Sequence, residues 1–406
     1  GTDPMALCYP GHQFGQYVPR LGDGRALLMG QLQDPSGRRW DLQLKGSGRT
    51  LYSRQGDGKA VLRSTIREHL ASAAMHGLGI PTTLSLAIFG SDEPVYRERV
   101  ETGAMLIRVA PSHIRFGSFE YFFYGSRYDD LATLADFTID NYFPHLKDQG
   151  NPVLALLDEV VDRTARLIAR WQGVGFCHGV MNTDNMSIHG ITIDYGPYGF
   201  LDAYDPRHIC NHSDYHGRYA YDQQPRIALF NLSCLAQALL PLVDDDPQAA
   251  ADKATEVLRS YEARFDAAWL QEKRRKLGLA EERENDGELF DALLSIMQSV
   301  GADFTHTFRL LGESSPESLV SSLGESETLV SWLADYRERL DSEHAEEPSR
   351  RQLACAANPK YILRNYLAER AIRLAEDEDD YSEIDTLVQL VTSPFAAQPG
   401  KEDYAA

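Results

Sequence analysis

Two side chains with oxygen ligands stand nine residues apart near the middle of the chain, at Asn185 and Asp194. Asn185 lies in the polar segment 178–187, and Asp194 follows Ile193 and opens an Asp-Tyr-Gly turn. Amide and carboxylate oxygens are ligands that Mg²⁺ accepts. If a tight loop carries the Asn and a short strand ends at the Asp, both can reach one cation. The spacing therefore predicts a magnesium site.

The same segment lacks one residue that phosphotransferases of the protein-kinase type use. Those enzymes hold magnesium with a catalytic-loop Asn and with the Asp of an Asp-Phe-Gly turn, and a general-base Asp stands five residues before the Asn. Val180 occupies that position here. The segment predicts metal and nucleotide binding without the usual hydroxyl base.

Glycines and one lysine predict where phosphates would lie. Three Gly-x-Gly units, at 22–24, 46–48 and 56–58, surround a predicted strand that ends at Lys45. Backbone amides of such loops can cradle phosphate groups, although a single unit of this kind often serves only a turn. The repetition beside a lysine favours a phosphate site.

Three further charged residues could be either solvated surface residues or parts of the phosphate site. Glu68 lies on a predicted helix, 23 residues after Lys45, where a kinase-like fold places the Glu that pairs with the strand Lys. A lone helical Glu is otherwise a solvated carboxylate. Arg108 and Arg115 flank the expected connection between sheet and helices, where they could clamp phosphates or remain solvated.

Alternating and helical periodicity predicts the elements that position these residues. Trp40, Leu42 and Leu44 share one face of a strand, with Lys45 on the other. Three histidines in the segment 204–225 are four residues apart, but nearby Pro and Gly residues favour a loop over a zinc-binding helix. The predicted strands are 26–33, 38–45, 81–89, 95–110 and a short one before Asp194, with a turn at 91–94; the predicted helices are 60–76, 128–146, 152–171, 226–242, 248–277, 287–311, 327–340 and 358–375.

Composition narrows the class of protein. The 406 residues are 43% hydrophobic and 25% charged, which is typical of a globular chain. A net charge of −20 disfavours a nucleic-acid partner. We see no apolar run near the roughly 20 residues of a membrane span. Five cysteines without a CxxC spacing predict reduced thiols.

Four motifs resemble the selenoprotein O family, also called the YdiU family. They are Tyr9–Gly15, Leu21–Ala26, Leu42–Gly48 and His178–Asn185. By that pattern, we expect the chain to begin some tens of residues inside the family sequence and to end before its usual C-terminal Cys or selenocysteine segment.

The resemblance implies an α+β, protein-kinase-like, two-lobed fold. We expect a β-rich N-lobe with the Gly-rich nucleotide-binding segment over 1–110. A mainly helical C-lobe over 111–392 would carry the catalytic loop, the metal site and extra C-terminal helices. A flexible tail would follow over 393–406.

The resemblance also implies a protein adenylyltransferase. Such an enzyme binds ATP in an orientation inverted relative to kinases, transfers AMP to Ser, Thr or Tyr hydroxyls of protein substrates, and releases pyrophosphate. Asp184 would accept the hydroxyl proton, although from the residues alone it could instead order the metal shell. The other implied residues are Lys45, Arg108 and Arg115 at the phosphates; Gly22, Gly24, Arg25, Asp57, Gly58 and Asp194 at the nucleotide; Glu68 paired with Lys45; and Asn185 and Asp194 on Mg²⁺, or Mn²⁺ in its place.

Two other functions remain open. A phosphotransferase could use Asp184 as a displaced base, but Val180 argues against it. A non-catalytic pseudokinase scaffold need not keep both Asn185 and Asp194. The expected partners are ATP and protein substrates, with no nucleic acid and no membrane, and the oligomeric state is unknown. The expected location is the cytoplasm for a bacterial protein and the mitochondrion for a eukaryotic one.

Overall fold

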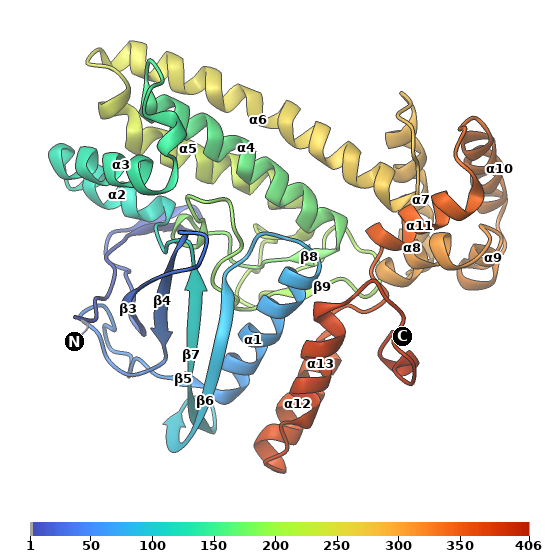
Figure 1. The fold of residues 1–406 in the computed structure, drawn as a ribbon, viewed down its shortest axis with the longest axis horizontal. Helices are drawn as coiled ribbons and strands as arrows, with labels where there is room; N and C mark the ends of the chain where they lie inside the picture. Colours follow the sequence, from blue (N-terminus) through green and yellow to red (C-terminus); the bar gives the residue numbers. More distant parts are fainter. Residues whose placement is uncertain (1–2, 406) are drawn as a thin grey trace.

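The computed structural model describes residues 3–405 and has mixed α and β content, as predicted. A five-stranded antiparallel sheet lies within the first 110 residues, and helices follow it (Figure 1). The strands are β1 Gly11–Gln13, β2 Gln16–Val18, β3 Ala26–Gln33, β4 Arg39–Lys45, β5 Ala60–Val61, β6 Leu84–Tyr96, β7 Val100–Ala110, β8 Phe176–Cys177 and β9 Gly199–Phe200.

Strand β7 is the centre of the sheet. Strand β6 pairs along one of its edges, and β4 and then β5 pair along the other, which places Arg108 opposite Gln43. The predicted turn at 91–94 is wrong, because β6 continues through it with an irregular register and the chain reverses only at Arg97–Arg99. A β-bulge in β6 accommodates the extra residues, and these are the residues that had predicted a turn.

The buried face of β4 is its polar face. Asp41, Gln43 and Lys45 are buried, whereas Trp40 and the two leucines are only partly covered. Apolar alternation alone would place the leucines in the core. The polar side chains instead face the candidate site, where other charged groups satisfy them.

Helix α1 (Leu62–Gly77) packs beside the sheet. Ile66, Leu70 and Met75 are fully buried, and α1 contacts β6, β7 and two helices from the end of the chain. Figure 1 shows α12 and α13 next to α1, so the C-terminal segment supports the helix that carries Glu68.

Helix α4 forms the axis of the helical part. Asn151 caps its N-terminus by accepting a hydrogen bond from the N–H of Leu154, and the face with Leu157, Val160 and Ile168 is fully buried. Helices α5 and α6 pack along it (Figure 1). The helices are α2 Phe116–Tyr124, α3 Tyr128–Tyr142, α4 Pro152–Gly173, α5 Gln224–Val243, α6 Pro247–Lys276, α7 Asp286–Val300, α8 Phe304–Glu313, α9 Ser318–Leu323, α10 Glu327–Asp341, α11 Glu347–Ala357, α12 Asn365–Asp377 and α13 Ser382–Thr392, with 3₁₀ turns η1 Pro144–Leu146, η2 Thr183–Asn185, η3 Tyr221–Gln223 and η4 Glu402–Ala405.

The C-terminal third differs from the prediction in three ways. The predicted helix 287–311 is two helices, because Gly301 takes a left-handed φ of 65° and Asp303 caps a new helix. Helices α9, α11 and α13 were not predicted, since acidic residues masked their short apolar faces. Helix α12 begins at Asn365, later than predicted.

Two connecting segments position the site. The predicted short strand before Asp194 is wrong, because Thr192 forms only an isolated bridge with Thr82. Residues 204–223 form a loop that ends in the 3₁₀ turn η3, as predicted, and helix α5 begins at Gln224, two residues earlier than the predicted helix. After α13, the carbonyl of Pro394 accepts hydrogen bonds from the amides of Lys360 and Tyr361 at 2.7 and 3.1 Å, which tie down the start of the segment predicted to be a flexible tail.

Within residues 3–405, one helical segment, Tyr221–Val243, is long and apolar enough by length and composition to cross a membrane. Our prediction of no such run overlooked it. Its apolar window is 56% buried inside the fold. Ile227, Leu232 and Leu239 pack into the main core, as in a core helix.

Candidate active site

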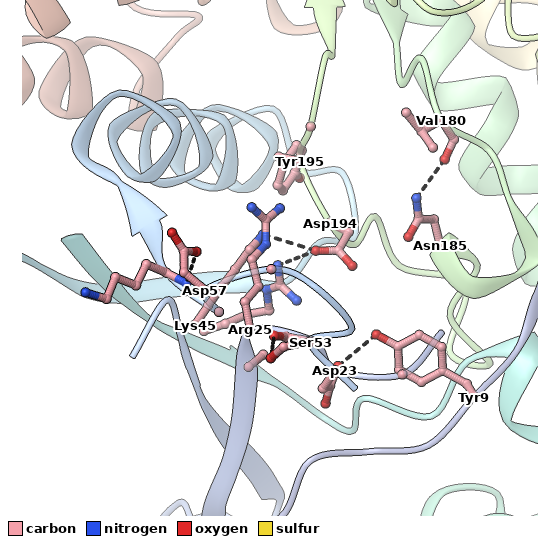
Figure 2. Close-up of a pocket in the computed structure, with 18 of the residues that line it drawn as sticks. Tyr9, Asp23, Arg25, Lys45, Ser53, Asp57, Val180, Asn185, Asp194 and Tyr195 are labelled. Atoms are coloured by element: carbon pink, nitrogen blue, oxygen red, sulfur yellow. Dashed lines mark hydrogen bonds and ion pairs between the residues drawn. The ribbon is translucent and has the colours of Figure 1, made fainter. Parts of the chain in front are cut away.

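A pocket of about 500 Å³ lies where β4, β7, the glycine-rich loops and the segment 180–196 meet. Figure 2 shows its side chains converging from the sheet and from the loop that carries Asp194. The predicted residues that line it are Gly22, Gly24, Arg25, Lys45, Asp57, Gly58, Arg108, Arg115, Asn185 and Asp194. Glu68 and Asp184 are the two predicted residues that do not line it.

Asp194 receives three cationic side chains at the inner end of this pocket. Its Oδ1 accepts from Lys45 Nζ at 3.2 Å and from Arg108 at 2.7 Å, and its Oδ2 accepts from Arg115 at 2.6 Å. Burial alone would raise the pKa of the Asp194 carboxyl, but Arg108, Arg115 and Lys45 hold it well below its usual value. Asp194 is therefore ionised.

Glu68 lies behind Lys45 and completes this buried charge cluster. Its Oε2 accepts from Lys45 Nζ at 2.5 Å, and its Oε1 accepts from Arg108 Nε at 3.0 Å. The side chain is 4% exposed. Arg108 and Lys45 outweigh the effect of burial and lower the pKa of Glu68. Glu68 thus fixes both cations from the side away from the pocket.

Asn185 presents an oxygen to the pocket. Its Nδ2 donates to the carbonyl of Val180 at 3.0 Å, which leaves Oδ1 pointing away from Val180, as Figure 2 shows. His178 fixes the segment before Asp194, because its Nε2 donates to the carbonyl of Ile193 at 3.0 Å. The amide oxygen of Asn185 and the carboxylate of Asp194 form a donor set that suits a hard divalent cation. These residues fit magnesium or manganese.

Asp184 lies beside the pocket, buried under the N-terminal hairpin β1–β2. Its Oδ2 accepts from Gln13 Nε2 at 3.3 Å, whereas Oδ1 is buried without a hydrogen-bond partner among the described residues. Burial raises the pKa of the Asp184 carboxyl to about 6, although the nearby Arg115 opposes this shift. Arg115 also donates to the backbone carbonyl of Asp184 at 2.6 Å and so joins it to the pocket.

The hairpin is held to the helical part through the residue before Asp184. The N–H of His12 donates to Thr183 Oγ1 at 2.7 Å, and that hydroxyl donates to Glu120 Oε2 at 3.0 Å. The His12 ring contacts the other oxygen of Glu120 at 3.1 Å. Sequence reasoning missed these residues as parts of the site, although the motif Tyr9–Gly15 that contains His12 was visible.

The glycine-rich loops pack backbone against backbone. Gly58 has a φ of +71°, and a β-carbon there would stand 2.0 Å from the carbonyl oxygen of Gly48. The Gly48 amide donates to the carbonyl of Gly58 at 3.2 Å, so this amide serves the loop contact. Asp57 pairs with Arg97, a pocket residue that we did not predict. The turn predicted at 91–94 placed Arg97 inside the next predicted strand, 95–110, so its position at the pocket was not predicted.

Asp23 is another residue that the sequence reasoning missed. It is 3% exposed and accepts from the hydroxyl of Tyr9 at 2.8 Å and from Gln43 at 3.0 Å. The ring of Tyr9 lies 4.6 Å from the guanidinium of Arg115. The sequence signals for this network were the place of Asp23 between two glycines and the motifs Tyr9–Gly15 and Leu21–Ala26, which contain Tyr9 and Asp23.

The charge distribution along the pocket indicates what it can bind. Lys45, Arg108 and Arg115 are 7%, 1% and 1% exposed, whereas Arg25 at the outer edge is exposed. Buried guanidinium groups recognise phosphate oxygens with several directed donors. The inner end is therefore suited to a polyphosphate and the outer edge to the remainder of a nucleotide.

Comparisons with known proteins agree with this chemistry. The model of the family described as "Protein adenylyltransferase SelO" matches residues 1–392. Three similar proteins are each named "Protein nucleotidyltransferase YdiU". The one from Thioalkalivibrio sulfidiphilus is 56% identical and the one from Myxococcus xanthus 52%, each over 100% of this chain and 83% of the relative. The one from Burkholderia multivorans is 53% identical over 99% of this chain and 80% of the relative.

Proposed function

We propose that this chain, which belongs to the SelO family and is a nucleotidyltransferase, transfers AMP from ATP to hydroxyl groups of protein substrates and releases pyrophosphate. The acceptors are Ser, Thr and Tyr side chains, and the reaction depends on Mg²⁺, with Mn²⁺ as the alternative ion. The relatives named above are bacterial, which favours a cytoplasmic location.

The observation that carries the proposal is the buried cluster of Lys45, Arg108 and Arg115 around Asp194. If the terminal phosphates bind these inner cations, the α-phosphate lies nearer the outer edge, where an acceptor can approach. Pyrophosphate would then leave toward fixed positive charge, which stabilises it as it forms. Val180, at the position of the kinase base, supports transfer of a group other than the γ-phosphate.

The step itself is an in-line displacement. The acceptor oxygen forms a bond to the α-phosphorus, the bond from that phosphorus to the bridging oxygen of the β-phosphate breaks, and the hydroxyl proton passes to the carboxylate of Asp184. A divalent ion on Asn185 and Asp194 would neutralise charge on the phosphates. Asp184 lies beneath Gln13, so the hairpin must shift locally for the acceptor to reach it.

The same proposal includes a kinase-like, two-lobed arrangement. The antiparallel sheet with α1 corresponds to an N-lobe over 1–110, and the helices correspond to a C-lobe over 111–392. The contact of Lys45 with Glu68 across β4 and α1 supports this arrangement, since kinases place a Lys–Glu pair there. The pocket between the two parts supports it as well.

ATP labelled at either the α- or the γ-phosphate tests the function. Protein-bound label from the α-phosphate alone is the expected result. Label from the γ-phosphate alone would instead establish a phosphotransferase, and an absence of both would establish a nucleotide-binding scaffold. Magnesium dependence is measured in the same assay by adding a chelator and then restoring Mg²⁺ or Mn²⁺.

A further inference from the structure

A second hollow, of about 680 Å³, lies beside the segment that carries Asp184. Its lining comes from the hairpin residue Phe14, from the loop 207–223 and from the start of α5. We name it the arginine groove after three of its residues, Arg207, Arg218 and Arg226. None of the residues proposed to bind the nucleotide lines it.

Hydrogen bonds connect the groove to the candidate catalytic residue. The N–H of Phe14 donates to the hydroxyl of Tyr219 at 2.8 Å, and that hydroxyl donates to Asn182 Oδ1 at 2.6 Å. Asn182 stands two residues before Asp184, and Gln13, next to Phe14, contacts Asp184. A chain lying in the groove would therefore pass close to Asp184.

The arginines of the groove are available for a partner. Arg207 and Arg226 are exposed, and across residues 3–405 neither forms an ion pair with a carboxylate. Arg218 packs over the ring of Phe230, 4.8 Å from its centroid, and its Nε is buried without a hydrogen-bond partner in the described chain. Most other arginines of this acidic chain have a carboxylate partner, so this grouping is unusual.

Two carboxylates also line the groove, and only one of them is free to oppose an acidic ligand. Asp214 is 3% exposed, and its oxygens accept from the backbone amides of Arg218 and Tyr219 at 2.9 and 2.7 Å. Asp222 is exposed and bonds the neighbouring Gln223. Three arginines thus face one solvated carboxylate.

Exposed apolar side chains complete the groove. Phe14 is 41%, Ile209 42% and Tyr215 87% exposed. Aromatic side chains beside arginines are enriched where proteins bind proteins. A nucleic acid would find little positive charge beyond this groove on a chain of net charge −20.

We propose that the arginine groove docks an acidic segment of the protein acceptor and so selects hydroxyl groups flanked by Asp or Glu. This inference rests on the proposed AMP transfer, because it names how that reaction chooses its acceptor. Arg207 and Arg226 pair with the acidic flank, and Tyr215 and Ile209 cover its apolar side chains.

Direct binding tests the groove without any chemistry. Fluorescence anisotropy compares labelled Ser-containing peptides that have Asp/Glu, neutral or Lys flanks. The full chain should bind the acidic peptide about tenfold more tightly than the neutral one, and less tightly as salt rises. The double variant Arg207→Glu with Arg226→Glu should lose that preference. The control, Arg38→Glu with Arg166→Glu, makes the same charge change at side chains 73% and 68% exposed, outside the groove, and should keep it.

Transfer of α-phosphate label provides the second measurement. In the groove variant, KM for the acidic peptide should rise about tenfold, while kcat and KM for ATP stay unchanged. Equal binding of all peptides by the full chain, an unchanged preference in the groove variant, or tighter binding of a single-stranded oligonucleotide would overturn the proposal. If no peptide is labelled but the acidic peptide binds through these arginines, the transfer proposal fails and the docking site stands.

Discussion

Gly11 touches the carboxylate of Asp184. A β-carbon at Gly11 would stand 2.3 Å from Oδ1 and 2.8 Å from Cγ of Asp184, much closer than atoms can approach. Gly11 belongs to strand β1, and Asp184 to the turn η2, far along the chain. The N-terminal hairpin therefore sets the position of the candidate proton acceptor.

Replacement of Gly11 with alanine should displace Asp184. We expect Gly11→Ala to lower the rate of AMP transfer about 100-fold, because a misplacement of about 1 Å at a reacting group has that effect. ATP affinity should change little, since neither residue lines the nucleotide pocket. Gly150→Ala is the control, because a β-carbon there meets nothing within 4 Å. Full activity of Gly11→Ala would show that Asp184 needs no fixed position.

Substitution of Asp194 tests the metal assignment. Asp194→Ala should abolish AMP transfer, to below about 1% of the wild-type rate, because it removes the proposed metal ligand and the anion that orders three cations. Asp194→Asn keeps the shape, and Asn tolerates the φ of 63°. We expect it to fold but to bind Mn²⁺ weakly in electron paramagnetic resonance with ATP present. Retained Mn²⁺ binding and transfer in both variants would refute the assignment.

The sequence predicted the parts of the site that depend on residue type and order. Lys45 at a strand end and Glu68 on the next helix meet in the structure because local periodicity predicts that strand and that helix. Asn185 and Asp194 both line the pocket, but residue type and spacing indicated them, since the strand predicted before Asp194 did not form. Short-range patterns carry this information, since a strand or a helix orients its side chains without reference to the rest of the chain.

The missed parts depend on contacts between distant segments. Nothing near Asp184 indicates that Gly11 and Gln13 cover it, because the two segments meet only through the tertiary fold. The polar buried face of β4 also follows from the site it faces, not from its own pattern. The break between α7 and α8 at Gly301 could have been predicted from the sequence, since glycine readily takes the left-handed φ that ends a helix.

The buried position of Glu68 gives it a structural role as well as a positioning role. Within residues 3–405, Glu68→Gln leaves Lys45 and Arg108 with Asp194 as their only close carboxylate, so we expect the free energy of unfolding in urea to fall by about 3 kcal/mol. Glu369→Gln removes an exposed ion pair and should leave stability nearly unchanged. A loss of the same size in both variants would show that the buried cluster is not special.

Lys276 makes the stability of the C-terminal part depend on pH. Burial lowers the pKa of Lys276 to about 7, and its Nζ donates to Asn358 at 3.0 Å. In the unfolded chain its pKa is about 10.4. Between pH 7 and 10 the unfolded state therefore binds more protons, and the contribution of Lys276 to stability rises with pH.

Lys276→Met should consequently stabilise the protein more at pH 7 than at pH 10, with a difference of about 3.5 kcal/mol in the free energy of unfolding. Urea unfolding at the two pH values measures it. Lys253→Met is the control on the same helix, since the Lys253 side chain is 47% exposed. An equal effect of Lys276→Met at both pH values would mean that Lys276 stays charged in the fold.

Val180 allows a test of the direction in which ATP binds. Val180→Asp restores a carboxylate at the position of the kinase base, beside Asn185 and Asp194. If the γ-phosphate lies against the inner cations, as we propose, this carboxylate faces the wrong phosphate, and no label from the γ-phosphate should reach protein. Transfer from the α-phosphate should fall about tenfold, because Val180→Asp adds a negative charge next to the proposed metal ligands. Val180→Asn has a similar shape without the charge and should lose less. The appearance of γ-phosphate label on protein in Val180→Asp would mean that ATP binds in the kinase orientation and that only the base had been lost.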